Sequence, residues 1–145
     1  SNVRGASVYT LSENASDKEA AALARKENKA DIIAGEDLSV YDENVAHILL
    51  DIQQRSTMQE SAYFAEMLVG DLGKQTTLLR NTHRFAGFAV LKSPTVPSVL
   101  VELGYLSNRK DEKLLRDPKH HKKIATAILQ ASDKFFKRLA DLNKS

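Results

Sequence analysis

One glutamate stands where the chain leaves a short apolar run. Glu102 follows Val99-Leu100-Val101 and precedes Leu103-Gly104-Tyr105. In α/β sheets ligands bind at the carboxyl ends of strands, and apolar surroundings raise the pKa of a carboxyl group towards the range of a general base. Glu102 is therefore the residue best placed for acid–base chemistry. A glutamate that only caps a helix or forms an ion pair at a strand edge would give the same pattern.

The four histidines do not form a metal-binding pattern. His120 and His121 are adjacent in a lysine-rich helix start and are predicted to lie on a charged solvent face. His47 lies beside an apolar stripe, and His83 lies in a stretch without clear periodicity. None recurs at i, i+4 with another ligand type, so a zinc site made from this chain alone is not expected. Nucleophile-elbow and phosphate-loop motifs are absent as well.

Composition describes one domain and excludes several functions. The chain has 145 residues, 42% hydrophobic and 28% charged, with a net charge of +2 and no cysteine. The lack of cysteine excludes disulfides, thiolate metal sites, iron–sulfur clusters and thiol catalysis. The balanced charge argues against a nucleic-acid partner, and no apolar run approaches the ~20 residues of a membrane span. We expect neither a signal peptide nor an anchor within this sequence.

The N-terminal half predicts a strand followed by helices. Residues 6–11 have the apolar, β-branched character of a strand, and a Ser-x-x-Glu capping box at Ser16 opens a helix over 17–29. The polar stretch 51–57 predicts a joint, after which Thr57 would cap a fresh helix. Before the joint we expect a helix with an apolar stripe made of Val45, Ile48, Leu49 and Ile52.

The C-terminal half predicts two buried strands and a long helix. Residues 73–85 give a mixed signal, interpreted as a helical turn and loop, whereas 87–91 and 98–103 are continuous apolar runs typical of buried strands. Asp117-Pro118 predicts the start of a helix whose apolar stripe continues to Phe135. The fold class is therefore α/β, with a central, mostly parallel sheet flanked by helices.

The number of strands is small for such a sheet. Three convincing strands are found, whereas a covered parallel sheet has about five or six. We expect further strands upstream of Ser1, which would make this chain the C-terminal portion of a larger domain. Without those strands the exposed edge would favour aggregation or pairing with a partner.

Three stretches of sequence together resemble one family. They are RGASVYTLSENASDKEAAALARKENKADIIAG (4–35), ILLDIQQRSTMQES (48–61) and AGFAVLKSPTVPSVLVELGYLSN (86–108). In these stretches the chain resembles zinc-dependent N-acetylmuramoyl-L-alanine amidases, and more narrowly the cell-division type from the Gram-negative periplasm. The resemblance covers nearly the whole chain. It implies an α/β domain of about six strands, of which 1–145 would be the C-terminal portion with about three.

The resemblance also implies a reaction and a metal. Family members hydrolyse the amide between muramic acid and the L-alanine of the peptidoglycan stem, in cell-wall remodelling and daughter-cell separation. Their Zn²⁺ is held by His, Glu and His upstream of the strand that matches 6–11, so this chain would be inactive by itself. Glu102 matches the catalytic glutamate, which moves a proton towards the leaving amine while zinc lowers the pKa of a bound water to about 7.

Residues 12–55 resemble the inserted regulatory region of the division amidases. In those proteins a glutamate from a helical insert occupies the open zinc position until a LytM-like activator draws the helix away. Glu27 is the best candidate for this inhibitory ligand, with Glu19 as the other, and a solvated helix face is the alternative for Glu27. The stripe from Val45 to Ile52 would be either an activator-docking surface or core.

Two hypotheses follow from the resemblance. The first is an autoinhibited, zinc-dependent peptidoglycan amidase of the periplasm, with peptidoglycan and an activator protein as partners. The second is a metal-free, amidase-like module that binds peptidoglycan or an activator without cleaving. Zinc content and activity separate the two.

Overall fold

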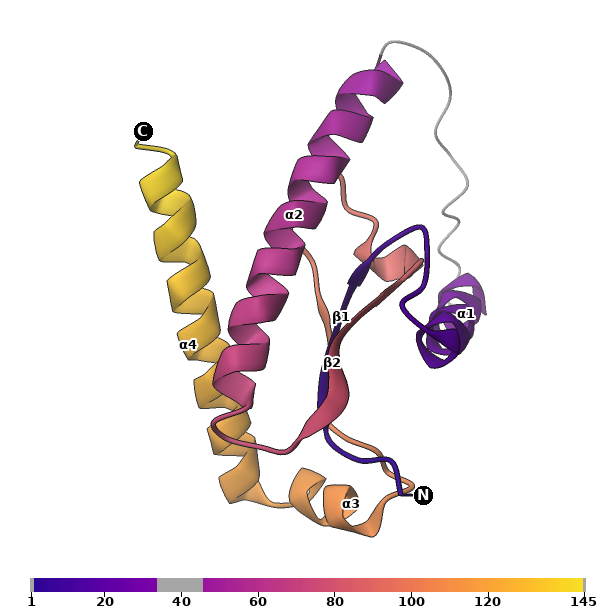
Figure 1. The fold of residues 1–145 in the computed structure, drawn as a ribbon, viewed down its shortest axis with the longest axis vertical. Coiled ribbons are helices and arrows are strands. Elements are labelled where there is room, and N and C mark those ends of the chain that lie inside the picture. Colours follow the sequence, from indigo (N-terminus) through magenta and orange to yellow (C-terminus); the bar gives the residue numbers. More distant parts are fainter. Residues whose placement is uncertain (1, 34–45, 145) are drawn as a thin grey trace. The chain divides into compact units, whose positions relative to one another are not determined.

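The computed structural model describes residues 2–33 and 46–144 and confirms the α/β class. Within these residues, three strands form one mixed sheet in the order β2-β1-β3. Backbone hydrogen bonds join Ala6 to Thr77 and Ser12 to Ala86, so β1 and β2 run in the same direction. The elements (Figure 1) are β1 (Ala6–Leu11), α1 (Lys18–Ile33), α2 (Ala46–Leu72), β2 (Leu78–Ala86), the 3₁₀ turn η1 (Ala89–Leu91), β3 (Leu100–Glu102), α3 (Arg109–Leu115) and α4 (Pro118–Leu142).

Contacts divide the chain into two compact units, which we name after one residue of each. The Glu102 unit consists of Ser1–Val8, Tyr63–His83 and Val101–Ser145. The Arg84 unit consists of Tyr9–Ala62 and Arg84–Leu100. Each unit has buried apolar side chains of its own, and each is described separately below.

In the Arg84 unit, α1 confirms the predicted helix but not its predicted cap. Asp17 Oδ1 accepts a hydrogen bond from the Ala20 amide (2.8 Å), and Ser16 Oγ donates to Asp17 Oδ2 (3.0 Å). The N-cap is therefore Asp17, and Ser16 supports it, because the helix begins one residue later than a capping box at Ser16 requires. Ala20 and Ala24 of α1 pack in a core with Tyr9, Ala86, Phe88 and Leu91.

The predicted joint at 51–57 is wrong, because α2 runs without a break through this stretch. Nothing in it forbids a helix, and its polar residues Asp51, Gln53 and Ser56 are exposed to solvent. Thr57 caps nothing: it is buried, and its Oγ1 donates to the Pro94 carbonyl (2.8 Å). Of the predicted apolar stripe, Ile52 is exposed, and the side chains of the other members lie outside the described residues.

Two further predictions fail in the segment that follows α2. Residues 78–86 form strand β2 instead of a turn and loop, because β2 is an edge strand of the described sheet and carries polar residues where a central strand would be apolar. Residues 87–91 do not form the predicted strand, because 89–91 form a 3₁₀ turn and the two residues before it have no regular structure. Phe88 and Leu91 are buried in the core, whereas Val90 is exposed. Asn28 holds the backbone here, with its amide donating to the Gly87 carbonyl and accepting from the Ala89 amide (both 2.9 Å).

In the Glu102 unit, α4 begins as predicted, with Asp117 as N-cap and proline at the first helical position. It packs beside the last turns of α2 (Figure 1), where the Phe64 and Phe135 rings lie 5.0 Å apart. His121 is exposed, but His120 is buried, which corrects the predicted solvent face. The reason is spacing, since His120 stands four residues before Ile124 and shares its inward face.

Candidate active site

Glu102 is the last residue of β3, so the structure places it at the carboxyl end of a strand as predicted. Glu102 is half-buried and has an interaction partner in the structure. The strand has only three residues, LVE, and its neighbour in the sheet is β1. The predicted run 98–103 is thus strand only at its centre, and a loop that leads to α3 follows Glu102 directly.

Just beyond Glu102, a buried carboxylate gathers three partners. Asp111 Oδ2 accepts hydrogen bonds from the backbone amides of Gly5 (2.8 Å) and Tyr105 (3.1 Å). Asp111 Oδ1 lies 3.3 Å from Nε of Arg4. We call this arrangement the Asp111 brace, because one side chain joins the residues before β1 to the loop after β3. No local pattern in the sequence singles out Asp111.

The position of Asp111 is set by the start of α3. Asn108 is the N-cap of this helix, and its Oδ1 accepts from the amides of Lys110 (3.0 Å) and Asp111 (3.4 Å). Asp111 therefore stands in the first turn, where a carboxylate is favoured by the exposed amides of the helix end. The sequence signal that could have predicted this helix is the pair Ser107-Asn108, which offers a capping side chain shortly before the acidic Asp111.

Two glycines allow the backbone to approach the brace. A Cβ atom on Gly104 would lie 3.1 to 3.3 Å from three side-chain atoms of Asp111, which is tighter than nearly all real contacts. Gly5 has a φ of 105°, and a Cβ there would lie 2.6 Å from the backbone carbon of Leu78. Only glycine fits at Gly5 without displacing the backbone.

A shallow pocket of about 540 Å³ opens beside the brace. Arg4, Arg109 and Lys110 make it basic, whereas Asp111, the nearby acid, is already engaged by Arg4. Such a surface attracts anionic groups. The pocket is lined by Asn2, Arg4, Ser107, Asn108, Arg109 and Lys110.

The metal implied by the family resemblance does not fit the side chains that the structure describes. Among them, no three His, Cys, Asp or Glu residues come together in a group that could hold a metal ion. His83 is half-buried on β2, and burial lowers its pKa, partly opposed by Glu66. His121 Nε2 lies 2.6 Å from the Leu115 carbonyl, and the side chain of His47 lies outside the described residues. We therefore derive no chemical step through zinc.

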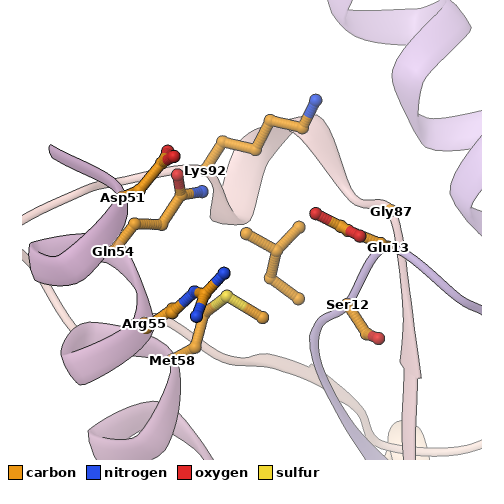
Figure 2. A pocket seen from close by; sticks show the side chains of 9 residues that line it. Ser12, Glu13, Asp51, Gln54, Arg55, Met58, Gly87 and Lys92 are labelled. Carbon is orange, nitrogen blue, oxygen red and sulfur yellow. The ribbon is translucent and has the colours of Figure 1, made fainter. Parts of the chain in front are cut away.

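The Arg84 unit holds a second pocket, of about 470 Å³, at the carboxyl end of β1. Figure 2 shows Arg55 and Met58 reaching into it from α2, with the Glu13 carboxylate facing them from the other side. Leu11 and Met58 supply apolar surface, and the charges around them have both signs. The lining residues are Leu11, Ser12, Glu13, Asp51, Gln54, Arg55, Met58, Gly87 and Lys92.

Arg84 joins the start of α1 to β1 and β2 within this unit. Its guanidinium donates to both carboxylate oxygens of Asp17, to Glu19 (3.1 Å) and to the Tyr9 hydroxyl (3.0 Å). Hydrogen bonding to Arg84 holds the pKa of Asp17 well below its usual range, and the pKa of Arg84 is raised in turn. Glu19 thus has a structural partner, while Glu27 is half-buried two turns further along α1.

Comparison with known proteins identifies the family. The family model for N-acetylmuramoyl-L-alanine amidase matches residues 1–134. The chain belongs to the N-acetylmuramoyl-L-alanine amidase family. It is 36% identical to amidase AmiC of Escherichia coli O6:H1 over 91% of this chain and 32% of the relative. It is 38% identical to AmiA of Escherichia coli K12 over 91% of this chain and 46% of that protein.

A solved structure shows the same fold. The N-acetylmuramyl-L-alanine amidase Ami1 of Mycobacterium smegmatis superposes with a TM-score of 0.54 at 20% identity, covering 94% of this chain and 49% of that one. The chain therefore spans less than half the length of these relatives. Within residues 2–33 and 46–144, none of the helices combines the length and apolar character needed to cross a membrane.

Proposed function

We propose that this protein is a peptidoglycan amidase that cleaves the bond between N-acetylmuramic acid and L-alanine, with Glu102 as the general acid–base residue. The observation that carries the proposal is the position of Glu102, at the carboxyl end of β3 in a chain that matches the amidase family over residues 1–134. Ligands of α/β proteins bind at such strand ends.

The proposed reaction requires Glu102 to transfer a proton. Amide hydrolysis needs a group that takes a proton from the attacking water and delivers it to the leaving nitrogen, and a carboxylate can do both. The half-buried position of Glu102 suits this role, because partial removal from water strengthens its interaction with a reacting group. The family resemblance supports Zn²⁺ as the cofactor, held by residues other than those that the structure describes.

Regulation by the region 12–55 is part of the proposal. Glu27 of α1 is the proposed inhibitory ligand, and a LytM-like protein is the proposed activator. The ion pair between Glu19 and Arg84 favours Glu27 over Glu19, because Glu19 would have to leave Arg84 to reach a metal. From the family resemblance we propose that it acts in the periplasm of a Gram-negative cell, during separation of daughter cells.

The test uses the complete native polypeptide. Release of stem peptides from purified peptidoglycan is followed by mass spectrometry for wild type, Glu102→Gln and the control Glu112→Gln. Glu112 belongs to the same unit, and its exposed ion pair with Arg116 contributes little. We expect Glu102→Gln to lower kcat by about 10²- to 10⁴-fold, which is the usual contribution of a general acid–base residue, and Glu112→Gln to match wild type. Wild-type activity in Glu102→Gln would refute the proposed role.

A second function is compatible with the described side chains, among which no metal-binding group is found. In this alternative the protein is an amidase-like module that binds peptidoglycan or an activator without cleaving it. It predicts that the native protein contains no zinc, sediments with peptidoglycan and releases no peptide. About one zinc per chain together with peptide release would exclude it.

A further inference from the structure

We propose that Asp111 is the positioning residue that holds Glu102 in place for proton transfer. This inference rests on the proposed role of Glu102, and the residues that carry it all belong to the Glu102 unit. Asp111 does not touch the reacting atoms in this proposal. It acts through the backbone that follows Glu102.

The sheet anchors Glu102 on its N-terminal side only. Strand β3 has three residues and Glu102 is the last of them, so pairing within the sheet restrains the glutamate from one direction only. Beyond it, the backbone amide of Tyr105 is bound by Asp111, three residues after Glu102. Gly104, between them, packs against the same side chain. The loop is therefore fixed on the side where the sheet ends.

Burial of the Asp111 carboxylate has a cost in free energy. Asp111 is 3% exposed, and burying a charge is unfavourable unless the charge is paired and hydrogen-bonded. Its two oxygens are engaged by two amides and by Arg4, with none of the bonds directed to a neighbour in α3. The side chain thus tethers two distant backbone segments, Gly5 and Tyr105, to one point.

The expected consequence is catalytic. A general base must lie within hydrogen-bond reach of the proton that it moves, and a misplacement of about 1 Å can cost about 100-fold in rate. A loop released from Asp111 would let Glu102 sample positions away from the substrate. Glu102 is proposed to act in the chemical step, so its misplacement should lower kcat and change KM much less.

Two substitutions distinguish the effect of the hydrogen bonds made by Asp111 from the effect of its negative charge. Asp111→Ala removes all three contacts. Asp111→Asn keeps one oxygen, which can still accept from both Gly5 and Tyr105, but loses the ion pair with Arg4. We expect kcat to fall about 100-fold in the alanine variant, and Asp111→Asn to restore most of that loss.

Asp71 provides the matched control. It is also a buried aspartate of the Glu102 unit, 1% exposed, and it is bound by Lys74 and Lys134 (both 2.7 Å). Asp71→Ala and Asp71→Asn should lower the melting temperature of the protein and leave kcat and KM unchanged. All variants are assayed as the complete native polypeptide, below their melting temperatures, on a soluble muropeptide.

The closing experiment places Asp111→Ala and Asp111→Asn in wild type and in Glu102→Gln. If Asp111 acts through Glu102, its substitution lowers kcat in wild type and adds no further loss in Glu102→Gln. The inference would be overturned if Asp111 substitution lowered kcat equally in the two backgrounds. It would also be overturned if the kcat values of the Asp111 variants matched those of the Asp71 variants. If Glu102→Gln is itself fully active, the proposed function fails, which is a distinct result. If Asp111→Ala does not fold, Asp111→Asn carries the test: the part of the loss that it does not restore must leave its kcat below that of Asp71→Asn.

Discussion

Removal of the Arg84 guanidinium should destabilise the protein more than any exposed ion pair could. Arg84 is 2% exposed and is bound by Asp17, Glu19 and the Tyr9 hydroxyl, with its guanidinium carbon 5.5 Å from the centre of the Tyr9 ring. Arg84→Met keeps much of the apolar stem and removes every one of these polar contacts. The Tyr9 hydroxyl then loses its bond to the guanidinium, and Asp17 loses its cation.

The size of the effect follows from burial. Breaking a buried ion pair by removing one partner costs about 3–5 kcal/mol. The Asp17 side chain is 30% exposed and can be rehydrated, so the lower end, about 3 kcal/mol, is expected. For a domain of 150–250 residues, this corresponds to a melting temperature about 6–12 °C lower. Thermal and urea unfolding of the native polypeptide, followed by circular dichroism, measure both quantities.

Two checks make this reasoning refutable. Asp17→Asn keeps the helix cap and removes the charge, so in the double variant with Arg84→Met the two losses should overlap instead of adding. Since Arg84 lowers the folded pKa of Asp17, the stabilisation is complete above the ordinary aspartate value of 3.8 and is lost as the pH falls below it. A cost for Arg84→Met of under about 1 kcal/mol, or strict additivity with Asp17→Asn, would refute the argument.

Two other predictions concern stability. Gly5→Ala should lower the unfolding free energy by about 1–3 kcal/mol, because the new Cβ meets the Leu78 backbone at a positive φ. Gly70→Ala, in open space on α2, should raise the unfolding free energy by about 1 kcal/mol. Equal effects of the two substitutions in urea unfolding would contradict this. Burial lowers the folded pKa of His83, so the unfolded chain binds more protons and stability should fall as the pH drops below 6.5. Between pH 7.5 and 5.5, the urea midpoint of His83→Gln should change less than that of wild type. If the two proteins show the same change, His83 does not cause the pH dependence.

Local signals predicted the elements whose cause is local. The strand over 6–11 and the helices α1 and α4 were expected from β-branched character, helix propensity and caps such as Asp117-Pro118. These features act over a few residues, so they can be recognised without knowing what packs against them. The same holds for Glu102, whose place after an apolar run identified a strand end.

Elements that depend on distant partners were not predictable in this way. Residues 87–91 are as apolar as a strand, yet 89–91 form a 3₁₀ turn, and Asn28, about sixty residues earlier, bonds to Gly87 and Ala89. Strand β2 was missed because an edge strand keeps polar residues. A periodic pattern of apolar residues indicates how much of an element is buried, but it does not indicate which other segment packs against that element.

The sequence alone determined the family, the α/β class and the residue proposed to move a proton, because short motifs and helix caps carry that information. The tertiary structure alone decided how that residue is held. Arg84 reaches Asp17 across 67 residues, and Asp111 reaches Gly5 across 106. A buried charge is tolerated only where partners neutralise it, and those partners become neighbours only when the chain has folded.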